Sequence, residues 1–136
     1  MYICENSYMT EGRLVLEKAH PFWTSPYDFS EMKRIAPDLY ATLEETSSFV
    51  LIKGDLNYRK LIGDLNWPHD TPLAQAVRTF RPAAFCAVRT CKADLIANLD
   101  VNMETNANFA KLLKSYPNTN KWMNTGDYGV IQFVPK

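Results

Sequence analysis

Two short apolar runs, each ended by polar residues, dominate the hydrophobic pattern of the chain. The first is Phe49–Ile52 and the second is Ala83–Val88. Uninterrupted apolar runs of this length predict strands of a parallel sheet that is covered on both faces. The residues between the runs predict a helix, a loop and a second helix, which together are long enough for a crossover to a parallel neighbour.

Helical patterns flank both predicted strands. Asp28 or Ser30 is expected to cap a helix that ends before Pro37, and Pro37 opens a second short helix. Thr71 is expected to cap a helix that starts at Pro72. The inner face of this helix is predicted to be Leu73, Ala76, Val77 and Phe80. A later helix is predicted to turn Phe109, Leu112 and Leu113 inward.

The last apolar segment, residues 126–134, predicts a turn and a final edge strand. Tyr128, Val130 and Ile131 are the residues of this strand expected in the core. Together, these elements alternate in the order typical of an α/β fold. We therefore expect a single domain over residues 1–136.

The composition of the chain argues against several classes of function. The 136 residues carry 15 basic and 15 acidic side chains, so no net field favours nucleic acid or an acidic membrane surface. No apolar run approaches the length of a membrane span, and residues 1–7 lack the pattern of a secretory signal. An odd number of cysteines (Cys4, Cys86 and Cys91, with Cys86 expected to be buried) favours a reducing compartment, so an intracellular, cytoplasmic protein is expected.

The residues that follow the two predicted strands carry the candidate chemistry. They are Asp55-Leu56-Asn57-Tyr58-Arg59 after the first strand and Arg89-Thr90-Cys91-Lys92 at the end of the second. Parallel strands end at the same edge of a sheet, where a helix amino terminus favours an anion. The guanidinium of Arg59 suits phosphate or carboxylate.

Two further interpretations of these segments stay open. In the first, the junction has only a structural role: Asp55 or Asn57 caps the following helix, and Asp55 pairs with Arg59 across one turn. Phe22 and Trp23, in a loop between two prolines, either fill a seam between elements or offer a stacking surface for a sugar or base.

Four segments together resemble a known family: Phe22–Thr24, Lys53–Leu61, Arg89–Lys92 and Gly126–Phe133. They are similar to the carboxyl-terminal part of the damage-control phosphatases. The subgroup they resemble is the sugar-phosphate phosphatases, also described as acidic-residue (protein-glutamate) methyltransferases, which carry an Arg-Thr-x-Lys motif. The chain has no glycine-rich loop that would suit a nucleotide-like methyl donor.

The resemblance implies an α/β/α layered fold and a metal-dependent phosphatase of small phosphorylated metabolites, such as fructose 1-phosphate or fructose 6-phosphate. Manganese or nickel is the implied cofactor. The implied substrate-binding residues are Asp55, Leu56, Asn57, Tyr58, Arg59 and Lys92, with Arg59 and Lys92 on the phosphate.

One departure from the family pattern is large. The metal ligands of the family include an Asp-Asn pair, and this chain contains no Asp-Asn dipeptide. We therefore expect a partial three-layer α/β/α sandwich with a mainly parallel sheet, which carries the substrate-binding part and no metal ligand. The alternatives are an inactive phosphate-binding module and a truncated remnant that self-associates through an exposed sheet edge.

Overall fold

The structure, a computed structural model, describes residues 8–117 and 119–136. Cys4 and the expectation drawn from residues 1–7 lie outside this part of the chain. The helices and strands are η1 (Pro21–Thr24), η2 (Phe29–Glu31), α2 (Met32–Ile35), α3 (Pro37–Thr46), β1 (Phe49–Lys53), α4 (Asp55–Leu61), α5 (Leu73–Ala76), β2 (Ala84–Thr90), α6 (Ala107–Ser115), η3 (Lys121–Asn124) and β3 (Gly129–Val134).

The three strands form one sheet in the order β1-β2-β3. β1 and β2 are parallel, with Ile52 opposite Ala87, and β2 and β3 are antiparallel, with Ala87 opposite Gln132. The segment between β1 and β2, with α4 and α5, forms the crossover. The prediction of an α/β fold with a parallel β1–β2 pair and a final edge strand is therefore confirmed.

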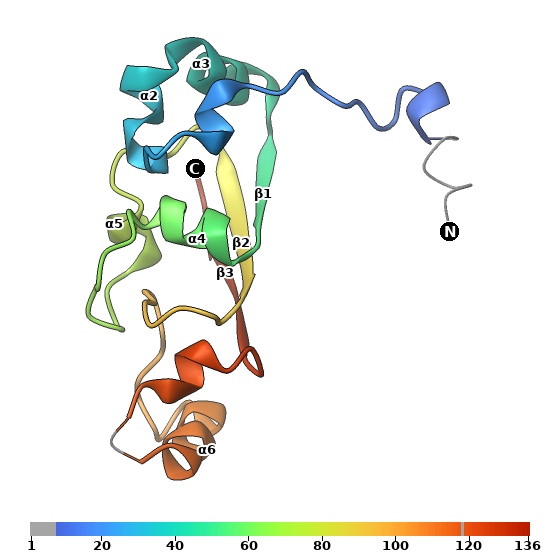
Figure 1. Cartoon of the computed structure of the whole chain (residues 1–136). Helices are drawn as coiled ribbons and strands as arrows, with labels where there is room; N and C mark the ends of the chain where they lie inside the picture. The colour runs from blue at the N-terminus through green and yellow to red at the C-terminus, as the bar shows by residue number, and fades with distance from the viewer. Residues whose placement is uncertain (1–7, 118) are drawn as a thin grey trace.

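In the part of the chain that the structure describes, the sheet is covered on one face. Helices α2 to α5 all lie on the same side of the strands (Figure 1). Ile52 and Phe85 point to this side and are 6% and 0% exposed, whereas Leu51 and Ile131 point to the other side and are 62% and 78% exposed. The prediction of a sheet covered on both faces is wrong for the described residues, which form two layers of the expected three.

Side chains on the covered face alternate along each strand, as the two-residue period of a strand requires. In β3 the inward residues are Val130, Gln132 and Val134, so the expectation that Ile131 is in the core is wrong. In β2 the same alternation leaves Cys86 only partly buried, contrary to prediction. Of the two described cysteines, Cys91 is the buried one, and it packs with Trp122 and Met123 in a second, smaller cluster that residues of α6 contact.

The predicted helix caps are right in one case and wrong in another. The Asp28 carboxylate accepts a hydrogen bond from the Ser30 N–H at 2.9 Å, as predicted. Thr71 does not cap α5, which begins at Leu73 after Pro72 with no side-chain cap. α5 is only four residues long, so Val77 and Phe80 reach the core from the loop that follows it.

The loop of η1 fills a seam through Phe22, whereas the stacking role of Trp23 stays a prediction. Phe22 is 2% exposed and packs against Phe29, while Trp23 remains 42% exposed. The Lys60 ammonium donates to the Phe22 carbonyl at 3.3 Å and to the Ser25 carbonyl at 2.9 Å, which ties the loop to α4. Within the described residues, no helix combines the length and the apolar character needed to cross a membrane.

Candidate functional site

A glycine makes the junction between β1 and α4. Gly54 has a φ of 101°, a conformation that residues with a Cβ rarely adopt, and its N–H donates to the Val88 carbonyl of β2 at 2.8 Å. Gly54 is also the N-cap of α4, without a side-chain cap. The alternative in which Asp55 or Asn57 caps the helix is therefore wrong: Asn57 instead donates its amide to the Lys53 carbonyl at 2.8 Å, and Asp55 is the first residue of the helix.

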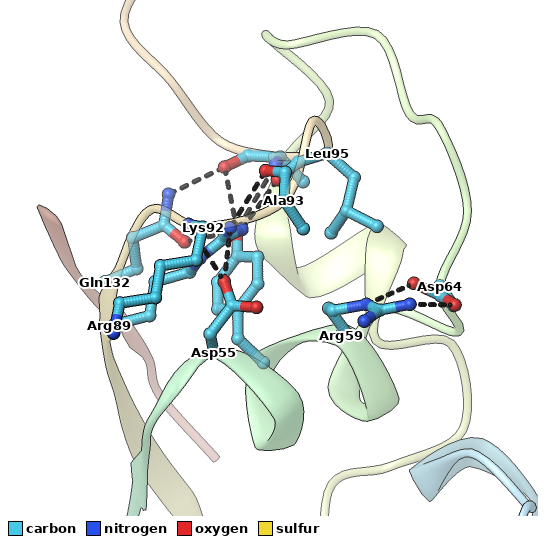
Figure 2. Close-up of polar contacts among 10 residues, drawn as sticks. Asp55, Arg59, Asp64, Arg89, Lys92, Ala93, Leu95 and Gln132 are labelled. Atoms are coloured by element: carbon cyan, nitrogen blue, oxygen red, sulfur yellow. Dashed lines mark hydrogen bonds and ion pairs between the residues drawn. The ribbon is translucent and has the colours of Figure 1, made fainter. Parts of the chain in front are cut away.

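The ends of β1 and β2 meet through Asp55 and Arg89. Nη2 of Arg89 lies 2.6 Å from Oδ1 of Asp55. The same guanidinium donates to the Leu95 carbonyl at 2.6 Å and to the Ala93 carbonyl at 3.1 Å. Figure 2 shows Arg89 reaching along the strand end to the loop above it. The parallel pairing therefore brings these two predicted residues together, and Arg89 also holds the loop that carries Lys92.

The ring of Tyr58 supports this ion pair from the interior. Tyr58 is fully buried, and the Arg89 guanidinium carbon lies 4.6 Å from its ring centroid. Its hydroxyl donates to Oε1 of Gln132 at 2.8 Å and accepts from the Ala97 N–H at 3.2 Å. Burial raises the pKa of the Tyr58 hydroxyl, which stays neutral. Because its hydroxyl is hydrogen-bonded in the core, Tyr58 does not offer this group to a ligand, and its ring packs against Arg89. The substrate-binding role that the resemblance implies for Tyr58 stays a prediction.

Gln132 was missed as a member of this network. It donates through Nε2 to the Ala97 carbonyl at 2.6 Å, which fixes the orientation of its amide. The available signal was a lone polar residue at an inward position of the alternating strand Gly129–Val134. A buried amide at such a position needs partners, because an unsatisfied polar group is costly in the core.

Arg59 pairs with Asp64 and not with Asp55. Nε and Nη2 of Arg59 lie 2.7 Å from Oδ1 and Oδ2 of Asp64, a bidentate arrangement. These hydrogen bonds raise the pKa of the Arg59 guanidinium and lower the pKa of the Asp64 carboxyl. Figure 2 shows the Arg59 side chain turned toward Asp64 and away from the Asp55–Arg89 pair. The one-turn Asp55–Arg59 pair is therefore wrong, and sequence reasoning did not single out Asp64.

The remaining predicted residues line the edge in different ways. Lys92 is exposed, and its backbone N–H donates to Oδ1 of Asp55 at 3.4 Å. Thr90 is exposed at the end of β2, and Leu56 is 66% exposed on the first turn of α4. Cys91 is buried, and this burial raises the pKa of its thiol. The edge thus presents Asp55 and Lys92 to solvent, with Arg59 held to one side.

The side chains at this edge do not fit a divalent metal. Across residues 8–117 and 119–136, no three His, Cys, Asp or Glu side chains gather closely enough to hold an ion. Oδ1 of Asp55 already binds the Arg89 guanidinium. Manganese and other hard cations need several oxygen ligands. Among the described residues, this edge therefore carries cationic donors and no cluster of metal-ligating side chains.

Comparison with known proteins places these observations in a family. Residues 4–107 match the damage-control phosphatase ARMT1-like domain. The chain is 46% identical over 114 residues to the damage-control phosphatase ARMT1 of Danio rerio, which covers 84% of this chain and 23% of that relative. It is 40% identical over 126 residues to the human protein of the same name, covering 93% of this chain and 26% of that relative. The chain therefore spans about a quarter of the length of these relatives.

Proposed function

The chain belongs to the damage-control phosphatase ARMT1-like domain family, and from this premise we propose that it binds a small phosphorylated metabolite where β1 and β2 end. In this proposal, the chain forms the substrate-binding part of a phosphatase site. The observation that carries it is the parallel pairing of β1 and β2. That pairing sets Asp55 and the loop of Lys92 at one edge, joined by the buried Arg89.

The proposed roles follow from the chemistry of the side chains. Lys92 is an exposed point charge for a phosphate, and Arg59 has a planar set of donors that matches two phosphate oxygens. Oδ1 of Asp55 takes the contacts with Arg89 and with the Lys92 N–H, so Oδ2 is the oxygen proposed to accept from a sugar hydroxyl. By resemblance, the proposed ligands are fructose 1-phosphate and fructose 6-phosphate.

Hydrolysis is a separate part of the proposal. By resemblance, it requires a divalent ion, manganese or nickel, and we assign no ligand of that ion to this chain. Lys92 and Arg59 would bind the phosphoryl group as it passes from the sugar oxygen to water, and their positive charge offsets the charge that develops during this transfer. The sugar leaves as its free alcohol.

A second candidate function is that of a binding module, which binds the same ligand without hydrolysing it. The observation that favours it is the lack of a cluster of metal-ligating side chains within the described part of the chain. The two functions share one binding surface and differ only in whether the phosphate is released. A single set of proteins therefore tests both.

The experiment is calorimetric titration with fructose 1-phosphate, with unphosphorylated fructose as the control ligand. We expect wild-type binding to depend on the phosphate, and Lys92→Ala to weaken it about tenfold, the loss of one charge-assisted contact. Lys114→Ala, which removes a charge from exposed α6, is the matched control and is expected to change nothing. Binding that is equal for fructose and its phosphate, or unchanged in Lys92→Ala, refutes the proposed site.

Release of inorganic phosphate with added manganese then separates the two functions. Turnover that Lys92→Ala abolishes supports the enzyme. Phosphate-dependent binding without turnover supports the module, and the same ligand should then raise the melting temperature in proportion to the logarithm of its concentration.

A further inference from the structure

We propose that Asp64 is an internal competitor for the phosphate group and holds Arg59 in a closed position that a ligand must open. We call the Arg59–Asp64 ion pair the latch. The inference rests on the proposed function and deepens it, because it names a residue that sets affinity at the same site. It starts from the bidentate geometry of the pair.

The latch occupies the donors that a phosphate would use. A guanidinium binds a carboxylate or a phosphate through two parallel N–H groups. Both 2.7 Å hydrogen bonds of the latch use such groups, Nε and Nη2 of Arg59. A phosphate therefore cannot take the same two donors until the Asp64 carboxylate leaves.

The turn that ends α4 holds the competing carboxylate in place. The backbone N–H of Asp64 donates to the Arg59 carbonyl at 2.7 Å, so the two residues are joined by backbone as well as by side chain. Gly63 and Asp64 have φ values of 76° and 55°, which turn the chain back toward the helix. The Trp67 indole N–H donates to the Ile62 carbonyl at 2.9 Å and fixes the loop beyond. Asp64 therefore meets Arg59 without ordering a flexible segment.

The latch is also weak enough to exchange. The side chains of Arg59 and Asp64 are 39% and 54% exposed, so water screens the pair and both groups remain accessible. Arg59 and Asp64 together line a hollow of about 250 Å³ that also includes Leu56 and Lys60. With Asp64 bound, Arg59 lies on this side of α4 rather than over the Asp55–Arg89 pair (Figure 2).

Competition of this kind discriminates among anions. A ligand carboxylate that displaces Asp64 exchanges one carboxylate for another and gains little. A phosphate dianion carries more charge and more acceptor oxygens, so it gains from the exchange. The latch thus favours phosphorylated metabolites over carboxylic acids at Arg59.

The test is Asp64→Asn, which removes the charge and one acceptor while keeping a residue that tolerates the positive φ at this position. We expect the dissociation constant for fructose 1-phosphate to fall about threefold to fivefold, the range of a well-formed exposed ion pair. The discrimination against a carboxylate ligand such as gluconate should decrease in the same variant.

Asp94→Asn is the matched control. The Asp94 carboxylate also raises the pKa of Arg59 through its charge, but the contacts of the latch are with Asp64. A change in affinity that is equal in Asp94→Asn and Asp64→Asn overturns the latch, because it shows a general field effect. In an Arg59→Ala background, Asp64→Asn is expected to have no effect on affinity.

The outcomes separate the latch from the proposed function. Phosphate-dependent binding that needs Arg59 but does not change in Asp64→Asn overturns the latch and leaves the proposed site standing. Absence of phosphate-dependent binding in the wild type and in Asp64→Asn overturns both. Tighter binding in Asp64→Asn, lost in the double variant with Arg59→Ala, supports both.

Discussion

The carboxylate of Asp55 and the guanidinium of Arg89 meet at 2.6 Å and join the start of α4 to the end of β2. The Arg89 side chain is completely buried, whereas Asp55 keeps 20% of its side chain exposed. A buried cation needs a partner, and Arg89 finds it in Asp55 together with the Ala93 and Leu95 carbonyls. The ion pair is therefore part of the fold as well as of the candidate site.

Removing the Asp55 carboxylate should lower the stability of the protein, because the buried Arg89 charge then loses its partner. We expect Asp55→Ala to lower the free energy of unfolding by about 3–5 kcal/mol, since it leaves Arg89 buried without its carboxylate. Urea denaturation measures the change, and Asp94→Ala, at an exposed aspartate, is the control with an expected change below about 0.5 kcal/mol. Equal stability of the two variants would show that water or main-chain carbonyls satisfy Arg89 alone.

The hydroxyl of Tyr58 should contribute measurably to stability. Tyr58→Phe leaves Oε1 of Gln132 and the Ala97 N–H without this partner in the core. We expect a loss of about 1–3 kcal/mol, the cost of buried polar groups left unsatisfied. Tyr27→Phe, at a residue 42% exposed, is the control and should be nearly neutral. A loss in Tyr58→Phe no larger than in the control would contradict the network.

The two faces of the sheet should differ sharply in their response to truncation. Ile52 on the covered face is 6% exposed and Ile131 on the other face is 78% exposed. Ile52→Ala is expected to cost about 2–5 kcal/mol, and Ile131→Ala less than about 1 kcal/mol. Denaturant midpoints of the two variants, measured at low protein concentration, give the comparison. Similar losses would mean that the outer face is covered in solution.

Acid should weaken the contact between η2 and Arg78. Burial acts to raise the pKa of Asp28, but hydrogen bonds from Ser30 and the Arg78 guanidinium 2.8 Å away bring the pKa below its ordinary 3.8. A carboxyl with a lowered pKa in the folded state stabilises it above about pH 4, and this contribution is lost as pH falls through the folded-state pKa.

The pH dependence of the melting temperature in Asp28→Asn tests this contribution. The variant should be less stable than the wild type at pH 7, and the difference should shrink below about pH 4, where the wild-type carboxyl becomes protonated. Asp127→Asn, at an exposed aspartate, serves as the control. A difference between Asp28→Asn and wild type that stays constant from pH 7 to pH 3 would contradict the assignment.

Local patterns predicted most of the elements and the edge at which the chemistry gathers. The apolar runs gave β1 and β2 because four or more apolar residues ended by glycine or charge suit a short strand. Their parallel pairing followed from the length of the crossover between them. The ion-pair partners of the charged groups could not be predicted from the sequence. Arg59 has acidic residues on both sides in sequence, and only the turn at Gly63 selects Asp64.

Burial was the hardest property to predict. A run such as Phe49–Ile52 has the same appearance whether one or both faces are covered, and only the placement of α2 to α5 on one side decided that Leu51 lies open. Tyr58 sits within a motif of polar residues, yet the pitch of α4 turns it inward onto Arg89 and Gln132.

The sequence by itself determined most of the elements, the parallel pair and the family, since these depend on residue types at fixed spacings along the chain. Only the tertiary structure decided which polar groups pair: Asp55 with Arg89, Arg59 with Asp64, and Tyr58 with Gln132. The physical reason is that hydrogen bonds and ion pairs act over a few ångströms in space, so pairing depends on distances that the folded chain sets, both across the sheet and within the turn that ends α4.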